Sequence, residues 1–236
     1  RITTNFPDVL VEGCSGGGAR FDAGILCYSP QIWCSDDTDP IQRLRIQYGT
    51  SFGYPVSTVG AHVSASPNHQ TGRSTPIHTR AVTAMAGTFG YELDPGKLSD
   101  EEKESIKDQV RIFKKYYDLI QRGLYYRLSE IGEEPYTAWE SVSEDGSEAL
   151  LSLVVSDTQP NQALINLKLK GLDPQGIYEV NDESEKYRLK LPAFLAPSTE
   201  EERKIFSGDA LMNAGYTLPW MLGDYPAIQL YFKKIR

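Results

Sequence analysis

Two short segments near the start of the chain combine the residue types that sugar chemistry needs. The first runs from Cys14 to Asp22 and contains Gly16, Gly17 and Gly18. The second runs from Trp33 to Asp39 and contains three aspartates. A glycosidase uses carboxyl groups to move protons or to attack a sugar carbon. Glycine lets the backbone approach a flat sugar ring closely. The two segments together predict a candidate sugar site.

Each segment needs an element that positions it, and each has a short apolar run beside it. Val9-Leu10-Val11 precedes the glycines, and Ile32-Trp33-Cys34 precedes the aspartates. Continuous apolar runs of this length are typical of parallel strands buried on both faces. We therefore expect both segments to be loops at the carboxyl ends of strands, where barrel enzymes place their chemistry. Asp36 is then expected to be the last residue of its strand.

The chain up to about residue 122 alternates between expected strands and helices. Asp39 and Pro40 predict a helix that Gly49 ends. A strand at residues 56–60, a helix at 74–85 and a strand at 87–91 follow. The capping-box pair Ser99 and Glu102 begins a helix that Gly123 ends, and Ser99 and Glu102 should bond reciprocally. Its expected core-facing stripe is Ile106, Val110, Phe113, Tyr117 and Ile120.

These elements amount to about four β/α units, which cannot by themselves close an eight-stranded barrel. The pattern alone allows either an open sheet or the second half of a barrel.

From about residue 125 the pattern changes to antiparallel strands. Asp145-Gly146 lies between two strand-like runs and predicts a hairpin. Apolar and polar residues alternate over residues 165–170 and 228–233, as in half-buried strands. We expect a small β-sandwich here, with a domain boundary between residues 124 and 134. The charge run at residues 200–204 is interpreted as a solvated surface.

Composition excludes several classes of partner. The formal net charge of −8 argues against nucleic acid and against an anionic membrane surface. Three cysteines and three scattered histidines form neither a disulfide framework nor a metal-ligand motif, so no metal or cofactor is expected. No apolar run is long enough to span a membrane. The sparse cysteines and the lack of a visible signal peptide favour a cytoplasmic protein.

A family resemblance appears when five motifs are read in order. They are Phe6 to Asp22, Tyr28 to Asp39 (with Ile32-Trp33-Cys34-Ser35-Asp36-Asp37), Ile46 to Ser51, Gly60 to Ser64, and Pro67 to Gln70. The string resembles the α-galactosidases of glycoside hydrolase family 36, from Phe6 to about Leu128. A lone triple glycine would mean little, but five linked motifs are specific.

The resemblance implies a fold and a reaction. The fold is an α/β part, residues 1–128, that forms strands five to eight of a (β/α)8 TIM barrel. An all-β part follows, residues 129–236, as a C-terminal antiparallel β-sandwich. The reaction is retaining hydrolysis of terminal α-galactosyl groups, as in melibiose and raffinose, by two carboxylates.

The resemblance also assigns roles to individual residues. Asp36 matches the acid/base, although the adjacent Asp37 leaves that assignment one residue uncertain. Cys14, Gly16 and Gly17 match the segment that lines the galactose pocket. Arg20 and Asp22 are interpreted as an ion pair that holds the glycine loop. Trp33 is either a sugar platform or core, and His62 and His69 are interpreted as residues that order loops.

One departure from the family pattern limits the function of this chain alone. The family's nucleophile lies in a Lys-Trp-Asp type motif, which this sequence lacks. We therefore expect a catalytically incomplete chain whose partner is the N-terminal remainder of the enzyme, and the resemblance implies a homo-oligomer such as a tetramer. The alternatives are a non-catalytic galactoside-binding or assembly module, or a related galactosyltransferase or α-N-acetylgalactosaminidase.

Overall fold

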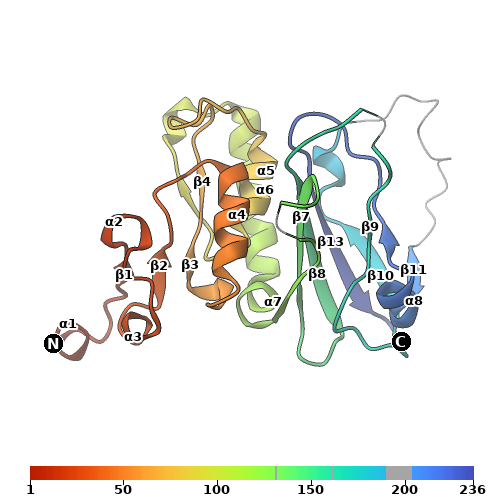
Figure 1. Cartoon of the computed structure of the whole chain (residues 1–236), viewed down its shortest axis with the longest axis horizontal. Helices are drawn as coiled ribbons and strands as arrows, with labels where there is room; N and C mark the ends of the chain where they lie inside the picture. Colours follow the sequence, from red (N-terminus) through yellow and green to blue (C-terminus); the bar gives the residue numbers. More distant parts are fainter. Residues whose placement is uncertain (131, 161, 190–203) are drawn as a thin grey trace. The chain divides into compact units, whose positions relative to one another are not determined.

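The computed structural model describes residues 1–130, 132–160, 162–189 and 204–236 (Figure 1). The chain divides into two compact units, Arg1–Glu104 and Ser105–Arg236. Residues 200–203 of the predicted charge run lie outside the described residues. No helix in the described ranges has the length and apolar character needed to cross a bilayer.

The first unit is built on short parallel strands that follow the order of the sequence. Strands β1 (Glu12–Gly13), β2 (Gln31–Trp33) and β3 (Val59–Gly60) form one parallel sheet in that order. Strand β4 (His62–Ser64) follows β3 almost directly and pairs in parallel with β5 (Gly90–Glu92). The predicted alternation of strands and helices is therefore confirmed in this unit.

Short helices connect these strands. The helical elements of the first unit are α1 (Ile2–Asn5), α2 (Ser15–Gly18), α3 (Ala23–Leu26), α4 (Pro40–Thr50), η1 (Val56–Thr58), α5 (Ile77–Ala84) and η2 (Pro95–Lys97). The Asp39 carboxylate accepts hydrogen bonds from the backbone of Ile41 at 2.9 Å and Gln42 at 3.0 Å, so it caps α4 as predicted. Gly49 lies inside α4, which ends one residue later at Thr50.

The predicted strand at Val9–Val11 is wrong. The structure places β1 at Glu12–Gly13, and Leu10 is 87% exposed. Among the described strands β1 pairs only with β2, so nothing in the described ranges covers the apolar run before it. The predicted strand at residues 56–60 is likewise short: the backbone of Thr58 bonds back to Pro55 at 3.0 Å, and this tight turn leaves only Val59–Gly60 extended.

The long helix predicted after Ser99 begins as expected but breaks. Ser99 and Glu102 bond reciprocally, at 3.1 Å and 3.0 Å, which confirms the capping box. The helix then divides into α6 (Asp100–Lys115) and α7 (Tyr117–Arg122). Tyr116 adopts a non-helical backbone at the break, and its hydroxyl donates to Glu183. The predicted core-facing stripe is therefore wrong at Tyr117, which is 48% exposed, whereas Tyr116 is buried.

The second unit is predominantly antiparallel β-sheet, as predicted. Its six-stranded sheet has the order β11-β10-β13-β8-β7-β6. A separate pair joins β9 to β12. The elements are β6 (Leu124–Arg127), β7 (Tyr136–Val142), β8 (Glu148–Val155), β9 (Asn166–Leu167), β10 (Ile177–Asp182), η3 (Glu185–Tyr187), β11 (Ile205–Ser207), α8 (Gly208–Asn213), β12 (Tyr216–Thr217) and β13 (Ala227–Lys234).

The hairpin at Asp145-Gly146 is confirmed, because β7 and β8 pair on either side of it. One face of the sheet packs against the segment that contains β9, α8 and β12. Strand β8 is buried along nearly its whole length, so both of its faces are covered. The core of the unit includes Ala138, Val142, Leu151, Leu153, Leu167, Leu169, Leu211, Leu218, Ile228, Leu230 and Phe232.

A carboxyl group lies inside this apolar core. Glu140 on β7 is fully buried, on the same face as Ala138 and Val142. One of its oxygens accepts a hydrogen bond from the backbone of Lys170 at 2.6 Å, and the other has no partner in the described residues. Burial raises the pKa of Glu140 to about 8, against the lowering effect of the Lys170 backbone bond. Glu140 is therefore mostly protonated at neutral pH.

We expect Glu140→Gln to remove a pH-dependent penalty on stability. The raised pKa means that the folded state holds a proton which the unfolded state loses above pH 4.5, so wild-type stability falls as pH rises from about 5 to about 9. The glutamine variant should gain on the order of 2 kcal/mol over wild type above pH 8, and little at pH 5. Thermal unfolding across this range, with the exposed Glu144→Gln as control, measures the difference. A constant offset between wild type and variant at all pH values would contradict it.

Candidate active site

Two loops meet at the carboxyl ends of β1 and β2. Strands β1 and β2 run parallel, with Gly13 opposite Ile32, so the loops that leave them emerge at the same edge of the sheet. The glycine-rich turn follows β1, and the segment from Cys34 to Asp39, here called the acid loop, follows β2. The structure therefore brings together the two segments that the sequence predicted as one site.

The glycine-rich turn winds in the left-handed sense. Ser15, Gly16, Gly17 and Gly18 have φ values of 55°, 67°, 76° and 87°. The backbone N–H of Gly18 closes the turn by donating to the carbonyl of Cys14 at 2.7 Å. An L-residue with a side chain pays about 1–2 kcal/mol for each such position, whereas glycine does not. The backbone conformation therefore favours glycine at positions 16 to 18, although Ser15 adopts it with a side chain.

The same glycines also allow the turn to lie directly against the acid loop. A Cβ atom on Gly17 would lie 3.1 Å from the backbone nitrogen of Asp36 and 3.3 Å from its carboxylate carbon. A Cβ atom on Gly18 would lie 2.9 Å from the carbonyl oxygen of Cys34. The Gly18 contact is too close for a Cβ atom, and a Cβ atom on Gly17 would require Asp36 to move by a few tenths of an ångström.

Asp36 faces this contact. It is exposed, and within the described ranges no group forms a hydrogen bond or ion pair with its carboxylate. The prediction that Asp36 is the last residue of its strand is wrong, because β2 ends at Trp33. The physical reason is Arg43, whose guanidinium donates to the carbonyls of Ser35, at 3.0 Å, and Gly60. These two carbonyls are therefore bonded to a side chain and not to a neighbouring strand.

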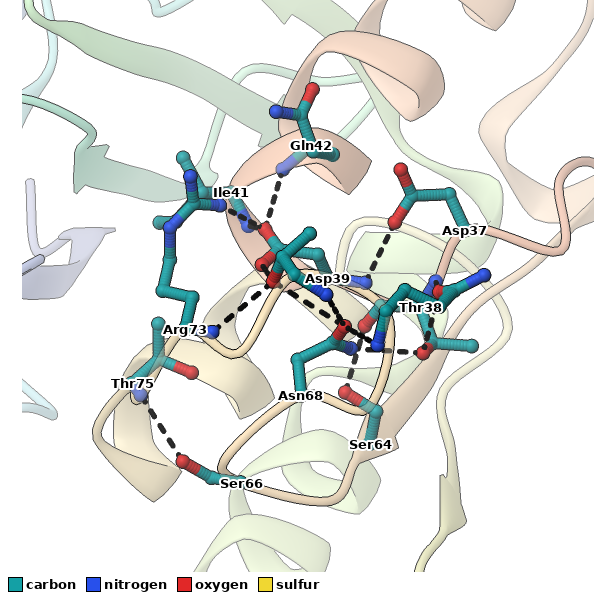
Figure 2. A network of polar contacts seen from close by, with 12 residues as sticks. Asp37, Thr38, Asp39, Ile41, Gln42, Ser64, Ser66, Asn68, Arg73 and Thr75 are labelled. Carbon is teal, nitrogen blue, oxygen red and sulfur yellow. Dashed lines mark hydrogen bonds and ion pairs between the residues drawn. The ribbon is translucent and has the colours of Figure 1, made fainter.

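The other two aspartates of the acid loop are used in local structure (Figure 2). Asp37 accepts a hydrogen bond from the backbone of Asp39 at 2.9 Å. Asp39 is fully buried, where it caps α4, pairs with Arg73 and accepts from the hydroxyl of Thr71 at 2.6 Å. Of the three carboxylates, that of Asp36 alone has no hydrogen-bond partner in the described part of the chain.

A cavity of about 320 Å³ lies beside Cys14. Its lining residues are Glu12, Cys14, Trp33, His62, Tyr91 and Glu92. The ring of Trp33 stacks on His62 at 4.5 Å and meets the guanidinium of Arg43 at 4.4 Å. Trp33 therefore borders the cavity while two side chains hold its ring, and its use as a sugar platform stays a prediction. Burial raises the pKa of the Tyr91 phenol, so it is a neutral wall group.

Three predictions about supporting residues have different outcomes. Asp22 does not pair with Arg20 in the described structure; its carboxylate caps α3 by accepting from Gly24 at 2.8 Å and Ile25 at 3.0 Å. His62 orders its surroundings as predicted, through Trp33 and an approach of 3.5 Å to Glu92. His69 is exposed, and its side chain makes no hydrogen bond or ion pair to the residues that the structure describes, so its role in ordering a loop stays a prediction.

Sequence reasoning missed Arg43 and Gln70, which hold the acid loop. Arg43 is buried next to Leu44 on the core side of α4, and a charged residue at such a position is a detectable signal. Gln70 lies inside the quoted motif Pro67 to Gln70, but its type gave no indication of its partners. Among the described residues no group of three or more His, Cys, Asp or Glu side chains could hold a metal ion.

Comparisons with known families agree with the division into two parts. Residues 1–123 match the model of the melibiase family. Residues 136–232 match the model of the glycosyl hydrolase family 36 C-terminal domain.

Individual relatives match over the whole chain. The chain is 52% identical over 236 residues to a bifunctional α-galactosidase/sucrose kinase of Mediterraneibacter gnavus, and covers 23% of that protein. It is 44% identical over 235 residues to the α-galactosidase AgaA of Geobacillus stearothermophilus, and covers 30% of it. The chain thus spans less than a third of the length of these relatives.

Solved structures match as well. The galactosidase domain of the α-galactosidase–sucrose kinase superposes with a TM-score of 0.89 at 52% identity, over 100% of this chain and 30% of that one. A crystal structure of the Geobacillus stearothermophilus AgaA in complex with raffinose superposes with a TM-score of 0.88 at 43% identity. The superposition covers 99% of this chain and 30% of the chain in the crystal structure.

Proposed function

This chain belongs to the melibiase family and carries a glycosyl hydrolase family 36 C-terminal domain, and we propose from that premise that it takes part in the retaining hydrolysis of α-galactosides. The observation that supports the proposal most directly is the environment of the Asp36 carboxylate. Its carboxylate is unpaired within the described residues and lies against the glycine-rich turn, whereas Asp37 and Asp39 have structural partners. Asp36 is thus available for chemistry.

In this mechanism Asp36 acts as the acid/base. Its carboxyl group donates a proton to the glycosidic oxygen as the bond from that oxygen to the anomeric carbon breaks. A second carboxylate attacks the anomeric carbon from the opposite face and forms a covalent galactosyl-enzyme. Asp36, now ionised, removes a proton from the water that releases galactose. The configuration at the anomeric carbon is inverted twice and so is retained.

We propose that the second carboxylate comes from outside residues 1–236. A retaining pair stands about 5–5.5 Å apart. In the acid loop, Asp37 holds the loop and Asp39 is buried as a helix cap. The two glutamates that line the cavity also have partners, because Glu12 accepts from Gln31 and Glu92 approaches His62. The absence of a Lys-Trp-Asp type motif points the same way. We therefore propose that this chain carries the acid/base and that the N-terminal remainder of the enzyme supplies the nucleophile.

The glycine-rich turn is proposed as one wall of the galactose pocket. Cys14, Gly16 and Gly17 stand beside Asp36 at the strand edge, and the left-handed turn leaves backbone N–H groups without side chains around them. Galactose offers ring hydroxyls that such groups can bind. Raffinose, which the AgaA crystal structure contains, is the type of substrate we propose for this site.

The fold proposal follows the same line. The described parallel strands would be strands five to eight of a (β/α)8 barrel, with β3 and β4 as two halves of one strand. In the described residues β1 and β5 each pair on one side only, and a barrel leaves no edge unpaired. We propose that other residues of the enzyme cover both edges. Residues 129–236, which lie within the second unit, are proposed to form a C-terminal sandwich. The enzyme is proposed to be a cytoplasmic homo-oligomer.

An assay of the complete enzyme, in which residues 1–236 are joined to the proposed N-terminal remainder, tests the proposed function. It should hydrolyse raffinose, melibiose and aryl α-galactosides, and NMR of the first product should show α-galactose. Initial β-galactose would contradict a retaining mechanism. Transfer of galactose to sucrose in place of hydrolysis would instead support a galactosyltransferase. Hydrolysis of 2-acetamido substrates would support an α-N-acetylgalactosaminidase, and binding without turnover would support a non-catalytic module.

A further inference from the structure

The segment from Asn68 to Arg73 contacts the acid loop at successive positions (Figure 2). The amide of Asn68 donates to the Thr38 hydroxyl at 3.0 Å. Thr71 and Arg73 both bind the carboxylate of Asp39. Asn68 is buried, and its carbonyl oxygen accepts from the backbone of Gln70 at 2.9 Å and of Thr71 at 3.1 Å. The segment therefore has hydrogen bonds of its own in addition to those it makes with the acid loop.

Gln70 binds both sides of the bend that contains Asp36 and Asp37. Its side-chain carbonyl accepts from the backbone N–H of Thr38 at 2.9 Å. Its amide nitrogen donates to the main-chain carbonyl of Asp36 at 3.1 Å. One side chain thus satisfies a backbone acceptor and a backbone donor that lie two residues apart.

The remaining backbone groups around Asp36 are also held. Arg43 donates to the carbonyl of Ser35, and the hydroxyl of Ser35 accepts from the backbone of Asp37 at 3.1 Å. Gly17 lies against the backbone nitrogen of Asp36. The peptide groups before and after Asp36 are fixed, whereas its carboxylate has no partner in the parts of the chain described. This arrangement is expected where a side chain must keep a set direction for chemistry.

We propose that Gln70 is a positioning residue that aims the carboxyl group of Asp36 at the glycosidic oxygen, an inference that rests on the proposed acid/base role of Asp36. Gln70 acts through the main chain of Asp36 and makes no hydrogen bond to the Asp36 carboxylate among the described residues. Because a misplacement of about 1 Å can cost ~100-fold in rate, loss of its two hydrogen bonds should reduce proton donation much more than it reduces stability.

The test is Gln70→Glu, which keeps the shape of the side chain. A carboxylate can still accept from Thr38 but has no hydrogen to donate to the carbonyl of Asp36, so the two oxygens repel. We expect kcat/KM for raffinose to fall ~10- to 100-fold. For an aryl α-galactoside with an electron-poor phenol, which leaves without protonation, kcat/KM should fall less than ~3-fold. General damage to the fold would lower both values by the same factor.

Gln42→Glu is the matched control, because Gln42 is also exposed near the acid loop and only its backbone is bonded there. It should leave both kcat/KM values and the Tm unchanged, which separates geometry from added charge. Asp36→Asn, measured in parallel, separates the two proposals. If Asp36→Asn shows the leaving-group dependence and Gln70→Glu does not, the positioning role is wrong. If neither variant shows it, the proposed acid/base is wrong.

Discussion

Replacing Asp36 with Asn is expected to lower kcat/KM for raffinose by ~10³-fold, while that for a dinitrophenyl α-galactoside falls less than ~10-fold. A sugar leaving group departs as a strongly basic alkoxide unless it is protonated, and asparagine has no such proton to give. A dinitrophenolate is weakly basic and leaves unaided. Steady-state kinetics on the two substrates measure the difference directly.

The second step of the reaction gives an independent readout on the same variant. Without a base to activate water, the galactosyl-enzyme should accumulate and the aryl substrate should show a burst of phenol release. Azide needs no deprotonation, so it should restore turnover and yield α-galactosyl azide. The α configuration follows because azide attacks from the face that water uses.

Asp37→Asn is the matched control for this experiment. The carbonyl oxygen of its side chain can still accept from the backbone of Asp39, so the loop should keep its form. The control should therefore show neither the leaving-group dependence nor the azide rescue. Equal losses on both substrates for Asp36→Asn, or the dependence appearing in Asp37→Asn, would refute the assignment of the acid/base to Asp36.

The features that the sequence predicted correctly depend on residues close together in the chain. Three such features are the Asp39 cap, the reciprocal bonds of Ser99 and Glu102, and the Gly146 hairpin, which the bond from Ser143 to Glu148 closes. Each joins groups within five residues of one another. Apolar periodicity then gave the parallel strand β2 and the antiparallel strand β13. Such patterns carry enough local information to set the order of elements.

The features that it missed depend on residues far apart. Gln70 binds groups 32 and 34 positions away, and Arg43 binds a carbonyl 17 positions away. The break at Tyr116 occurs where its hydroxyl meets Glu183, 67 positions on. Choosing Asp36 over Asp37 likewise needs the observation that Asp37 is already bonded. No local pattern indicates these partners. The sequence therefore located the candidate site but not the residues that hold it in place.

The glycine-rich turn provides the second large effect, through Gly17→Ala compared with Gly16→Ala. Both positions have positive φ, so backbone strain should destabilise both variants by about 1–2 kcal/mol. A methyl group on Gly16 meets nothing within 4 Å, whereas one on Gly17 lies 3.3 Å from the carboxylate of Asp36. Gly17→Ala therefore adds a displacement of the acid/base that Gly16→Ala lacks.

We expect this difference to separate binding from chemistry. Gly17→Ala should lower kcat for raffinose by ~100-fold, because the methyl group moves the proton donor. Gly16→Ala should mainly raise KM, since its methyl group extends into the space where the sugar is proposed to bind. Comparing kcat and KM for both variants at matched thermal stability isolates the contact with Asp36. If the two variants lose kcat equally, the turn adapts to the added methyl group, and the close fit of Gly17 does not fix the direction of Asp36.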